Sequence, residues 1–376
     1  MIYLDNAATS GVKPKSVIKA VYNALINLSA NPGRGGHRKS IESATSIFNV
    51  RSKLSKMFNA ESENSVIFTA NCTTSINILL NGVLNSGDHI IVSSLEHNAV
   101  MRPLNNLAVT KGISYDIVKI NVNEPEKSIV QFKNKIRNNT KMIFTTHASN
   151  VTGTLMPIKE IGRLCRAEGI LFGVDAAQSA GVINIDMKEC SIDYLCIASH
   201  KGLFAPMGTG VLIADKPIDN PFILGGTGVN SISLEQPDSL PERVESGTLN
   251  VPGICGIGAG IDFLNSHNKS KILQREKELL GYLYQMLKRL NAEIYTENPM
   301  GAQFVPVLSF NIKNRQSEET ADYLGKNMIA VRGGLHCAPF AHRTIGTLER
   351  GTVRISPSFF NTPEEMEKAV FLLKKF

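Results

Sequence analysis

The sequence has no long apolar run. No stretch approaches the roughly 20 apolar residues that a membrane helix needs, so no transmembrane helix is expected. Residues 1–6 include an acid at position 5 and lack the charged-then-apolar layout of a secretory signal, which predicts a cytoplasmic protein. Lysines and arginines are scattered rather than gathered in dense basic runs with aromatics between them. Nucleic-acid binding is therefore not expected, although the net charge is +7.

Cysteine pairs with C-x-x-C spacing are also absent. The chain has 6 cysteines, and their spacing indicates neither a zinc site nor a redox motif, so no metal is expected. Disulfides are not expected in a reducing cytosol. Five of these cysteines stand in apolar or helical contexts, but Cys337 follows His336 on a loop with two glycines, near Arg332. Cationic neighbours favour the thiolate form, so Cys337 is either a reactive thiol or an idle loop residue.

What the sequence does contain is the ordinary composition of a folded protein. It has 376 residues and 43% hydrophobic residues, enough for a large core. Strand-like apolar runs alternate with helical patterns over about 200 residues, which predicts an α/β fold with a mostly parallel, doubly wound sheet. We expect a large domain at 1–258 and a smaller α+β domain at 259–376. A helical region is expected at 253–290, and helices at 40–58, 76–84, 158–168, 318–326 and 363–374.

Polar side chains follow several of the predicted strands. Thr73, His97, Asn150, Asp175 and Lys201 each come just after an apolar run. Ligands of open α/β sheets bind at the carboxyl ends of the strands, so we expect these residues to share a site.

Lys201 and Asp175 have the chemistry that pyridoxal phosphate requires. The cofactor needs a lysine amine for its aldehyde and a carboxylate for its pyridinium nitrogen. A buried lysine loses its proton readily, which suits that role. The alternative is that Lys201 only caps a surface turn.

Other segments leave two interpretations open. Residues 71–75 follow a strand and precede a helix, which suits a phosphate cradle at Thr73 and Thr74 or an ordinary helix cap. The glycine-rich loop at 31–38 is either a flexible connection or a loop reaching the active site of a partner subunit. Arg354 lies within a strand and would bind a substrate carboxylate or form a structural salt bridge.

Seven motifs together resemble a known family. Leu-Asp-Asn-Ala-Ala-Thr, Glu-His-Asn, Ser-Asn-Val-Thr-Gly, Val-Asp-Ala-Ala-Gln, Ser-His-Lys-Gly, Glu-Ser-Gly-Thr-Leu-Asn and Arg-x-Gly-x-His-Cys-Ala occur in this order along nearly the whole chain. The sequence is similar to the class V aminotransferase-fold family, and within it to the group II cysteine desulfurases that include selenocysteine lyases. The resemblance implies the fold type I of pyridoxal phosphate enzymes.

The resemblance also implies a role for each matching residue. Lys201 would hold the cofactor and shuttle protons, and Cys337 would take the sulfur atom. His97 would stack on the ring. The other cofactor contacts would come from Asp175, Gln178, Thr73, Thr74, Ser199, His200 and, from the second subunit of a homodimer, Thr248. The substrate would face Asn150, Arg332 and Arg354.

The implied reaction converts L-cysteine to L-alanine and leaves a persulfide on Cys337 for a sulfur-acceptor protein, for example in iron–sulfur cluster assembly. L-selenocysteine is an alternative substrate that uses the same residues. Another pyridoxal phosphate lyase or an aminotransferase would not need Cys337, and a non-catalytic scaffold would not need Lys201. The cysteine loop departs from the best-known members, because Gly333 and Leu335 stand where they have Thr and His.

Overall fold

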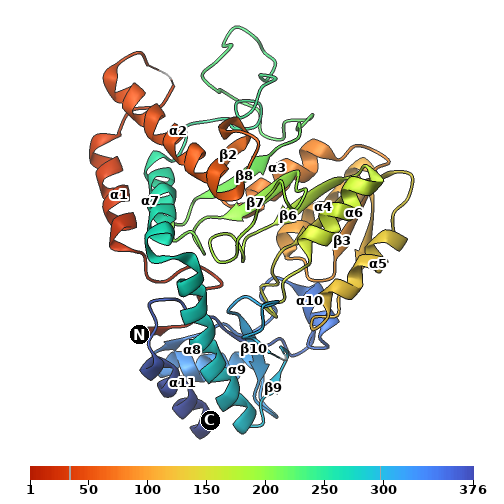
Figure 1. Ribbon diagram of the computed structural model, residues 1–376, viewed down its shortest axis with the longest axis vertical. Helices are drawn as coiled ribbons and strands as arrows, with labels where there is room; N and C mark the ends of the chain where they lie inside the picture. The colour runs from red at the N-terminus through yellow and green to blue at the C-terminus, as the bar shows by residue number, and fades with distance from the viewer. Residues whose placement is uncertain (34, 297) are drawn as a thin grey trace.

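A seven-stranded sheet forms the centre of the larger part of the molecule. The computed structural model describes residues 1–33, 35–296 and 298–376, and Figure 1 shows this sheet in its upper half. The strands lie in the order β2 (Val66–Thr69), β8 (Gly210–Ala214), β7 (Tyr194–Ala198), β6 (Leu171–Asp175), β5 (Thr140–Thr146), β3 (His89–Ser93) and β4 (Ser114–Val118). Strand β8 is antiparallel to both neighbours and the other pairs are parallel. The mostly parallel sheet is confirmed.

Helices cover both faces of the sheet because its strands alternate their side chains between two cores. In β2, Val66 and Phe68 face one core and Ile67 faces the other. The first core is shared with α2 (Arg38–Phe58), α5 (Ser128–Asn134), α6 (Ile158–Glu168) and α7 (Val251–His267). The second is shared with α3 (Cys72–Val83) and α4 (Asn98–Lys111). The sheet is therefore doubly wound, as expected.

A smaller α+β unit lies below this sheet (Figure 1). Strands β12 (Val353–Ile355), β10 (Leu308–Asn311) and β9 (Glu293–Ile294) form an antiparallel sheet, and β1 (Ile2–Tyr3) pairs in parallel with β11 (Ile329–Ala330). Its helices are α8 (Lys269–Arg289), α9 (Ser317–Lys326), α10 (Pro339–Thr344) and α11 (Pro363–Lys375). Leu4 belongs to the core of this unit. The first residues thus pack with the C-terminal region, and the boundary between 258 and 259 stays a prediction.

Two expected helices differ in the structure. The helical region at 253–290 is interrupted at Asn268, whose φ of +59° ends α7, and whose side chain accepts the Ser270 N–H at 3.1 Å to begin α8. Helix α3 begins at Cys72, earlier than residue 76, because Asn71 caps it.

Helix α1 (Lys15–Asn27) lies on α7 and not on the sheet. Only part of its apolar surface is buried. Val17 is buried, whereas Ile18 is 58% and Leu25 62% exposed. Apolar side chains therefore occur on two sides of α1, and the outer side is open to solvent.

Candidate active site

Five strands end at the same edge of the sheet and bring the predicted residues together. Strands β2, β3, β5, β6 and β7 run in one direction, and their carboxyl ends surround a cavity of about 230 Å³. The sequence-predicted residues that line it are Thr73, His97, Asn150, Asp175, Gln178, His200, Lys201, Arg332 and Arg354. Four other predicted residues do not line this cavity, namely Thr74, Ser199, Thr248 and Cys337. The expected clustering at the strand ends is thus observed.

Asp175 is the last residue of β6 and is 4% exposed. Its Oδ1 accepts the backbone N–H of Ala177 at 2.8 Å and the thiol of Cys72 at 3.6 Å. Burial raises the pKa of Asp175, while the Ala177 N–H and Lys201 act in the opposite direction. A cationic ring nitrogen next to this carboxyl would stabilise its charged form further.

Lys201 lies on the turn that follows β7. Its backbone N–H donates to Ala198 O at 3.2 Å, and the carbonyl of His200 is held by Ser10 N (3.1 Å) and Lys13 Nζ (3.0 Å). The N-terminal segment therefore fixes the turn. Burial lowers the pKa of the Lys201 amine, and the charge of Arg354 lowers it further, against the effect of Asp175. The lysine is consequently a better nucleophile and base than a solvated one.

His97 is the N-cap residue of α4. Its Nδ1 accepts the N–H of Ala99 at 3.0 Å, which leaves Nε2 to carry the ring proton. Burial lowers the pKa of His97 to about 4, and Lys201 and Arg332 contribute to that shift. The imidazole is neutral at physiological pH, as suits a ring that stacks on a planar cofactor.

The N-terminus of α3 is the candidate phosphate cradle. Thr73 lines the cavity, but the N–H and hydroxyl of Thr74 both donate to Asn71 Oδ1, at 2.9 and 3.1 Å. Thr74 instead lines a neighbouring cavity of about 270 Å³. Thr74 thus serves the helix cap in this structure, and its contact with phosphate stays a prediction.

Two further phosphate candidates lie at the end of β7. The side chain of Ser199 is fully buried, and its Oγ has no hydrogen-bond partner among the described residues. Next to it, the His200 ring lies 3.0 Å from Thr9 Oγ1, and burial lowers its pKa to about 4. An unpaired buried hydroxyl calls for a partner, and a bound oxyanion would supply one.

Thr248 lies outside the cavity that Lys201 lines. It borders the same neighbouring cavity as Thr74, and its hydroxyl accepts Asn31 Nδ2 at 3.4 Å. Asn31 belongs to the predicted glycine-rich loop at 31–38, of which Arg34 lies outside the described residues. Within one chain, Thr248 therefore does not reach the predicted cofactor site.

Arg354 lies at the floor of the cavity and is 1% exposed. Its Nη2 pairs with Asp5 Oδ1 at 2.7 Å and its Nη1 donates to Asn150 O at 3.1 Å. The structural salt bridge foreseen as an alternative is thus present. Nε is buried without a partner among the described residues, and the side chain also lines the cavity. Both interpretations of Arg354 are therefore compatible with its position.

Cys337 lies on a tight turn beside the cavity. The Ala338 N–H donates to Leu335 O at 2.9 Å, and the two central residues, His336 and Cys337, have φ of +50° and +58°. Such left-handed positions favour glycine or asparagine and cost about 1 kcal/mol or more for other residues. The Cys337 thiol is exposed, and Arg332 Nη2 donates to its Sγ at 3.6 Å. This turn therefore presents the thiol to solvent next to a cation.

Buried contacts hold this turn in place. Asn150 Nδ2 donates to His336 O at 2.8 Å, and Asn98 N donates to Cys337 O at 2.7 Å. The His336 ring is 2% exposed, and its Nε2 lies 3.0 Å from Thr352 O. Because Asn98 follows His97, the turn is tied directly to the wall of the cavity.

Sequence reasoning gave no role to several residues of the site. Asn71 and Cys72 line the cavity; they belong to the predicted cradle segment at 71–75, but only Thr73 and Thr74 of that segment were singled out. Glu96 is fully buried behind the wall, where its Oε1 accepts the Thr146 N–H at 2.9 Å. Burial raises the pKa of Glu96 to about 8. Its place in the Glu-His-Asn motif was the only available signal.

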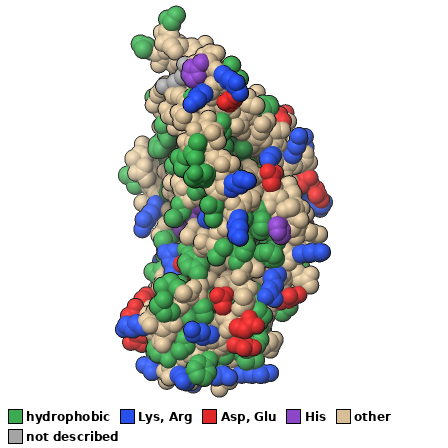
Figure 2. Space-filling model, turned by 90° about the vertical axis from the view of Figure 1, so that its left-hand side faces the viewer, with side chains coloured by type: hydrophobic (Ala, Val, Ile, Leu, Met, Phe, Trp, Pro, Cys, Tyr) green, Lys and Arg blue, Asp and Glu red, His purple; other side chains and the backbone are tan. Residues whose placement is uncertain are grey.

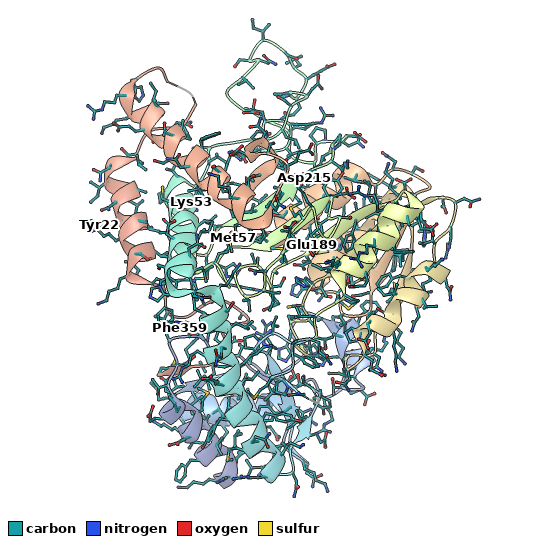
Figure 3. The ribbon with its side chains drawn as sticks, in the orientation of Figure 1. Tyr22, Lys53, Met57, Glu189, Asp215 and Phe359 are labelled. Carbon is teal, nitrogen blue, oxygen red and sulfur yellow. The ribbon has the colours of Figure 1, made fainter. Side chains whose placement is uncertain are left out.

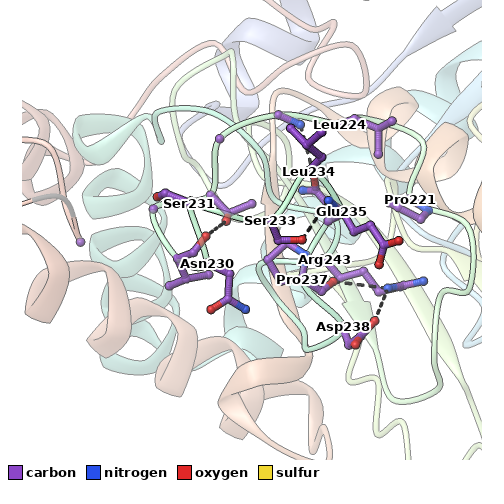
Figure 4. Close-up of a pocket in the computed structure, with 17 residues that line it drawn as sticks. Pro221, Leu224, Asn230, Ser231, Ser233, Leu234, Glu235, Pro237, Asp238 and Arg243 are labelled. Atoms are coloured by element: carbon purple, nitrogen blue, oxygen red, sulfur yellow. Dashed lines mark hydrogen bonds and ion pairs between the residues drawn. The ribbon is translucent and has the colours of Figure 1, made fainter.

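A larger cavity, of about 900 Å³, lies elsewhere. It is enclosed by the loop at 221–238 with Arg243 and Gly33, and Figure 4 shows these side chains. None of the predicted cofactor or substrate residues borders it. The chemistry of the smaller cavity therefore identifies the site better than size does.

Across the described ranges, no cluster of three or more His, Cys, Asp or Glu side chains could hold a metal ion. None of the described helices combines the length and the apolar character needed to span a bilayer.

Comparisons with known proteins agree with this geometry. The family model for class-V aminotransferases matches residues 2–369. A probable cysteine desulfurase of Methanothermobacter thermautotrophicus is 31% identical, with 97% of this chain and 92% of the relative covered. One from Borreliella burgdorferi is 32% identical, with 100% and 91% covered. The apo structure of a cysteine desulfurase from Thermococcus onnurineus superposes with a TM-score of 0.90 at 29% identity, covering 100% of this chain and 94% of the other.

Proposed function

Because the chain belongs to the class-V aminotransferase family, and its relatives are cysteine desulfurases, we propose that it converts L-cysteine to L-alanine and keeps the sulfur as a persulfide on Cys337. The observation that carries this proposal is the exposed thiol of Cys337 beside a cavity shared by Lys201 and Asp175. An aminotransferase or a carbon–carbon lyase would need the cavity but not the thiol.

The cofactor we propose is pyridoxal phosphate. Lys201 would bind its aldehyde, Asp175 its pyridinium nitrogen, Gln178 its ring hydroxyl and His97 its ring face. Thr73, Ser199 and His200 would hold the phosphate. The two guanidinium groups of Arg332 and Arg354 outnumber the carboxyl of Asp175 in the cavity, and this positive character suits a phosphate and a carboxylate. When bound, the cofactor withdraws electrons from the α-carbon of the substrate amino acid.

The side chains would then divide the reaction among them. Arg354 and Arg332 would bind the substrate carboxylate, and Lys201 would take the α-proton. The Cys337 thiolate would attack the substrate Sγ, so that an S–S bond forms as the Cβ–Sγ bond breaks. The electron pair of the broken bond stays with the substrate carbon, which gains a proton and becomes the methyl group of alanine. The Nη2 atom of Arg332 lies 3.6 Å from Cys337 Sγ and would keep the attacking sulfur next to the substrate.

The proposal is tested by incubating the purified protein with L-cysteine. We expect equal amounts of alanine and of protein carrying one added sulfur atom, located by peptide mass analysis on Cys337. Alanine without sulfur on Cys337 would refute the assignment of the thiol. Rates measured on cysteine and on selenocysteine would show which substrate is preferred, since the same residues serve both.

We also propose a homodimer, with a sulfur-acceptor protein as a further partner. The outer sides of α1 and α2 expose Ile18, Tyr22, Leu25, Ile26, Ile41 and Phe48, each 54% exposed or more. Tyr22 points away from α7 in Figure 3, and Figure 2 shows hydrophobic side chains gathered on this side of the molecule. Exposed apolar faces of this kind mark interaction surfaces. A second copy on this face would account for Thr248, which within one chain does not reach the cavity.

A further inference from the structure

Glu276 is a carboxyl group on the apolar stripe of α8. Its neighbours on that stripe, Ile272 and Leu279, are core residues, and Glu276 itself is only 7% exposed. Its Oε1 accepts the backbone N–H of Phe359 at 3.0 Å. Figure 3 shows Phe359 at the junction of α7 and α8. A carboxyl group in such a place needs an explanation, because burial disfavours its charge.

The surroundings of Glu276 make it a group that changes charge near neutral pH. Burial raises the pKa of Glu276 to about 8, against the Phe359 N–H. Within the described ranges, no ion pair includes Glu276. Near neutral pH it therefore holds a proton that it can give up at small cost.

A small cavity has both Glu276 and Lys201 on its wall, and apolar atoms form most of its lining. It has a volume of about 60 Å³, and its polar lining comes from Asn6, Ser10, Gln178, Lys201, Glu276, Ser356 and Ser358. A water molecule requires about 10–15 Å³ and two or more polar partners, so the cavity accommodates a short chain of waters. Lys201 and Gln178 also line the predicted cofactor cavity and so form the wall between the two spaces.

Lys201 and Glu276 are the two titratable side chains among the described residues that line the small cavity. Two other cations come from the segments around it. Lys13 donates to Ser10 Oγ and His200 O, and Arg354 pairs with Asp5. Burial lowers the pKa of Lys13 to about 8, so Lys13 needs a control in any pH experiment.

We propose that Glu276 is a positioning residue for the Lys201 proton, acting through water in this cavity. In one direction the O–H bond of Glu276 breaks, the proton passes along hydrogen-bonded waters, and an N–H bond forms at Lys201 Nζ. A carboxylate and an ammonium group result, and the reverse transfer restores the two neutral groups. The inference rests on the proposed function of Lys201 as the base that takes the α-proton, because that function requires the amine to be neutral before each turnover.

The test compares Glu276→Gln with the parent holoenzyme. Glutamine keeps the shape and an acceptor for the Phe359 N–H but cannot titrate, so we expect unfolding midpoints close to those of the parent. Without the carboxylate, the Lys201 amine loses its proton more easily. The pH titration of the cofactor–lysine absorbance should therefore shift down by about one unit. The rate of alanine formation should fall about tenfold.

A second readout does not require turnover. The rate at which pyridoxal phosphate combines with the apoprotein depends on the neutral fraction of the Lys201 amine, so its pH profile should shift in the same direction in Glu276→Gln. Lys13→Gln separates the contribution of Glu276 from that of Lys13, whose pKa is also about 8. The inference is overturned if the pH dependence of cofactor association is lost in Lys13→Gln and unchanged in Glu276→Gln. It is also overturned if Glu276→Gln changes only the stability of the protein. A parent protein that forms no cofactor absorbance would instead refute the proposed function.

Discussion

At the scale of single residues, Cys337 is the group that separates a desulfurase from other enzymes of the fold. We predict that Cys337→Ser keeps the cofactor absorbance, because the residue does not line the cavity of Lys201 and Asp175. Alanine formation should fall about a thousandfold, since a hydroxyl does not accept sulfur in this way. The absorption spectrum measures the bound cofactor, and product analysis by mass spectrometry measures alanine formation.

The matched control for this prediction is Cys255→Ser, a half-buried cysteine on α7 that lies outside the cavity. It should retain parental turnover. Parental turnover by Cys337→Ser would refute the assigned role of the thiol.

Asp175 is the second residue whose charge can be tested alone. Asp175→Asn keeps an oxygen for the Ala177 N–H at 2.8 Å but removes the negative charge from the cavity. We expect alanine formation about a hundredfold slower, because a ring nitrogen without its anionic partner withdraws electrons poorly. Single-turnover measurements on the cofactor-saturated variant separate this effect from weaker cofactor binding. An unchanged rate at saturation would contradict the role.

At the scale of elements, a buried ion pair fastens α2 to the segment that carries Thr248. Arg51 of α2 forms a bidentate pair with Glu245, which also accepts the Phe68 N–H of β2 at 2.7 Å. Arg51 is 8% exposed. Glu245→Gln leaves this guanidinium buried without its anion, so we predict a loss of about 3 kcal/mol in the free energy of unfolding.

Urea denaturation measures this loss, and an exposed pair supplies the comparison. Arg38 and Glu42 form an i,i+4 pair on the same helix with side-chain exposures of 91% and 43%. Glu42→Gln should change the unfolding free energy by less than about 0.5 kcal/mol. Equal losses of unfolding free energy in the two variants would show that burial does not make the Arg51–Glu245 pair more stabilising than an exposed pair.

The elements also show what the sequence could and could not predict. The strands β2, β6 and β7, which lead to Thr73, Asp175 and Lys201, were predictable, because buried strands appear as short apolar runs. The edge strand β4, half-exposed over most of its length, gave no such run and was missed. The turn at His336 and Cys337 was also hidden, because left-handed residues that are neither glycine nor asparagine leave no local signal.

Long-range contacts could not be predicted from the sequence for a different reason. Glu276 appears in the sequence as one charged residue of an amphipathic helix, and only the packing of 356–359 against α8 shows that it is buried. The pairing of Arg354 with Asp5 likewise joins residues 349 positions apart. Periodicity reports local structure and carries no information about such partners.

At the scale of the whole molecule, the apolar side of α1 predicts the state of association. The double variant Ile18→Asp and Leu25→Asp places two charges on side chains that are 58% and 62% exposed, so the fold should tolerate them. We expect light scattering to show a dimer for the parent and a monomer for the variant. If Thr248 acts from the second subunit, the monomer should also lose pyridoxal phosphate more easily on dialysis.

The control for association is Val109→Asp, on α4, where an apolar side chain is 81% exposed on another surface. It should remain dimeric and retain the cofactor. A monomeric parent protein would refute the proposed interface.

The pH dependence of stability belongs to the same scale. Burial lowers the pKa of His97, His147, His200 and His342 to about 4, so these rings stay neutral in the folded protein. Below a pH of about 6.5 these histidines bind protons in the unfolded chain but not in the folded protein, so the stability of the folded protein falls as the pH is lowered. Burial raises the pKa of Glu96 and Glu276 to about 8. Between a pH of about 4.5 and 8 these carboxyls are therefore protonated in the folded protein but ionised in the unfolded chain. The stability of the folded protein consequently falls as the pH rises through that range.

These groups together predict that the apoprotein is most stable near pH 6.5, where the stability gained as the histidines of the unfolded chain lose their protons balances the stability lost at the buried carboxyls. Thermal unfolding of the apoprotein across a pH series measures the optimum. Unfolding midpoints that rise steadily toward alkaline pH would contradict the assignment of the buried carboxyls.

The contact between Asp5 and Arg354 has a consequence for the synthesis of the protein. Ribosomes release a chain from its N-terminus, so Asp5 and strand β1 emerge long before β11 and β12 exist to receive them. The helices and strands of the central sheet can assemble in order as they appear, but the site that we expect to bind the substrate carboxylate stays open until residue 354 has left the exit tunnel. A nascent chain would therefore form the strand ends that carry Asp175 and Lys201 before it completes the substrate site at Arg354.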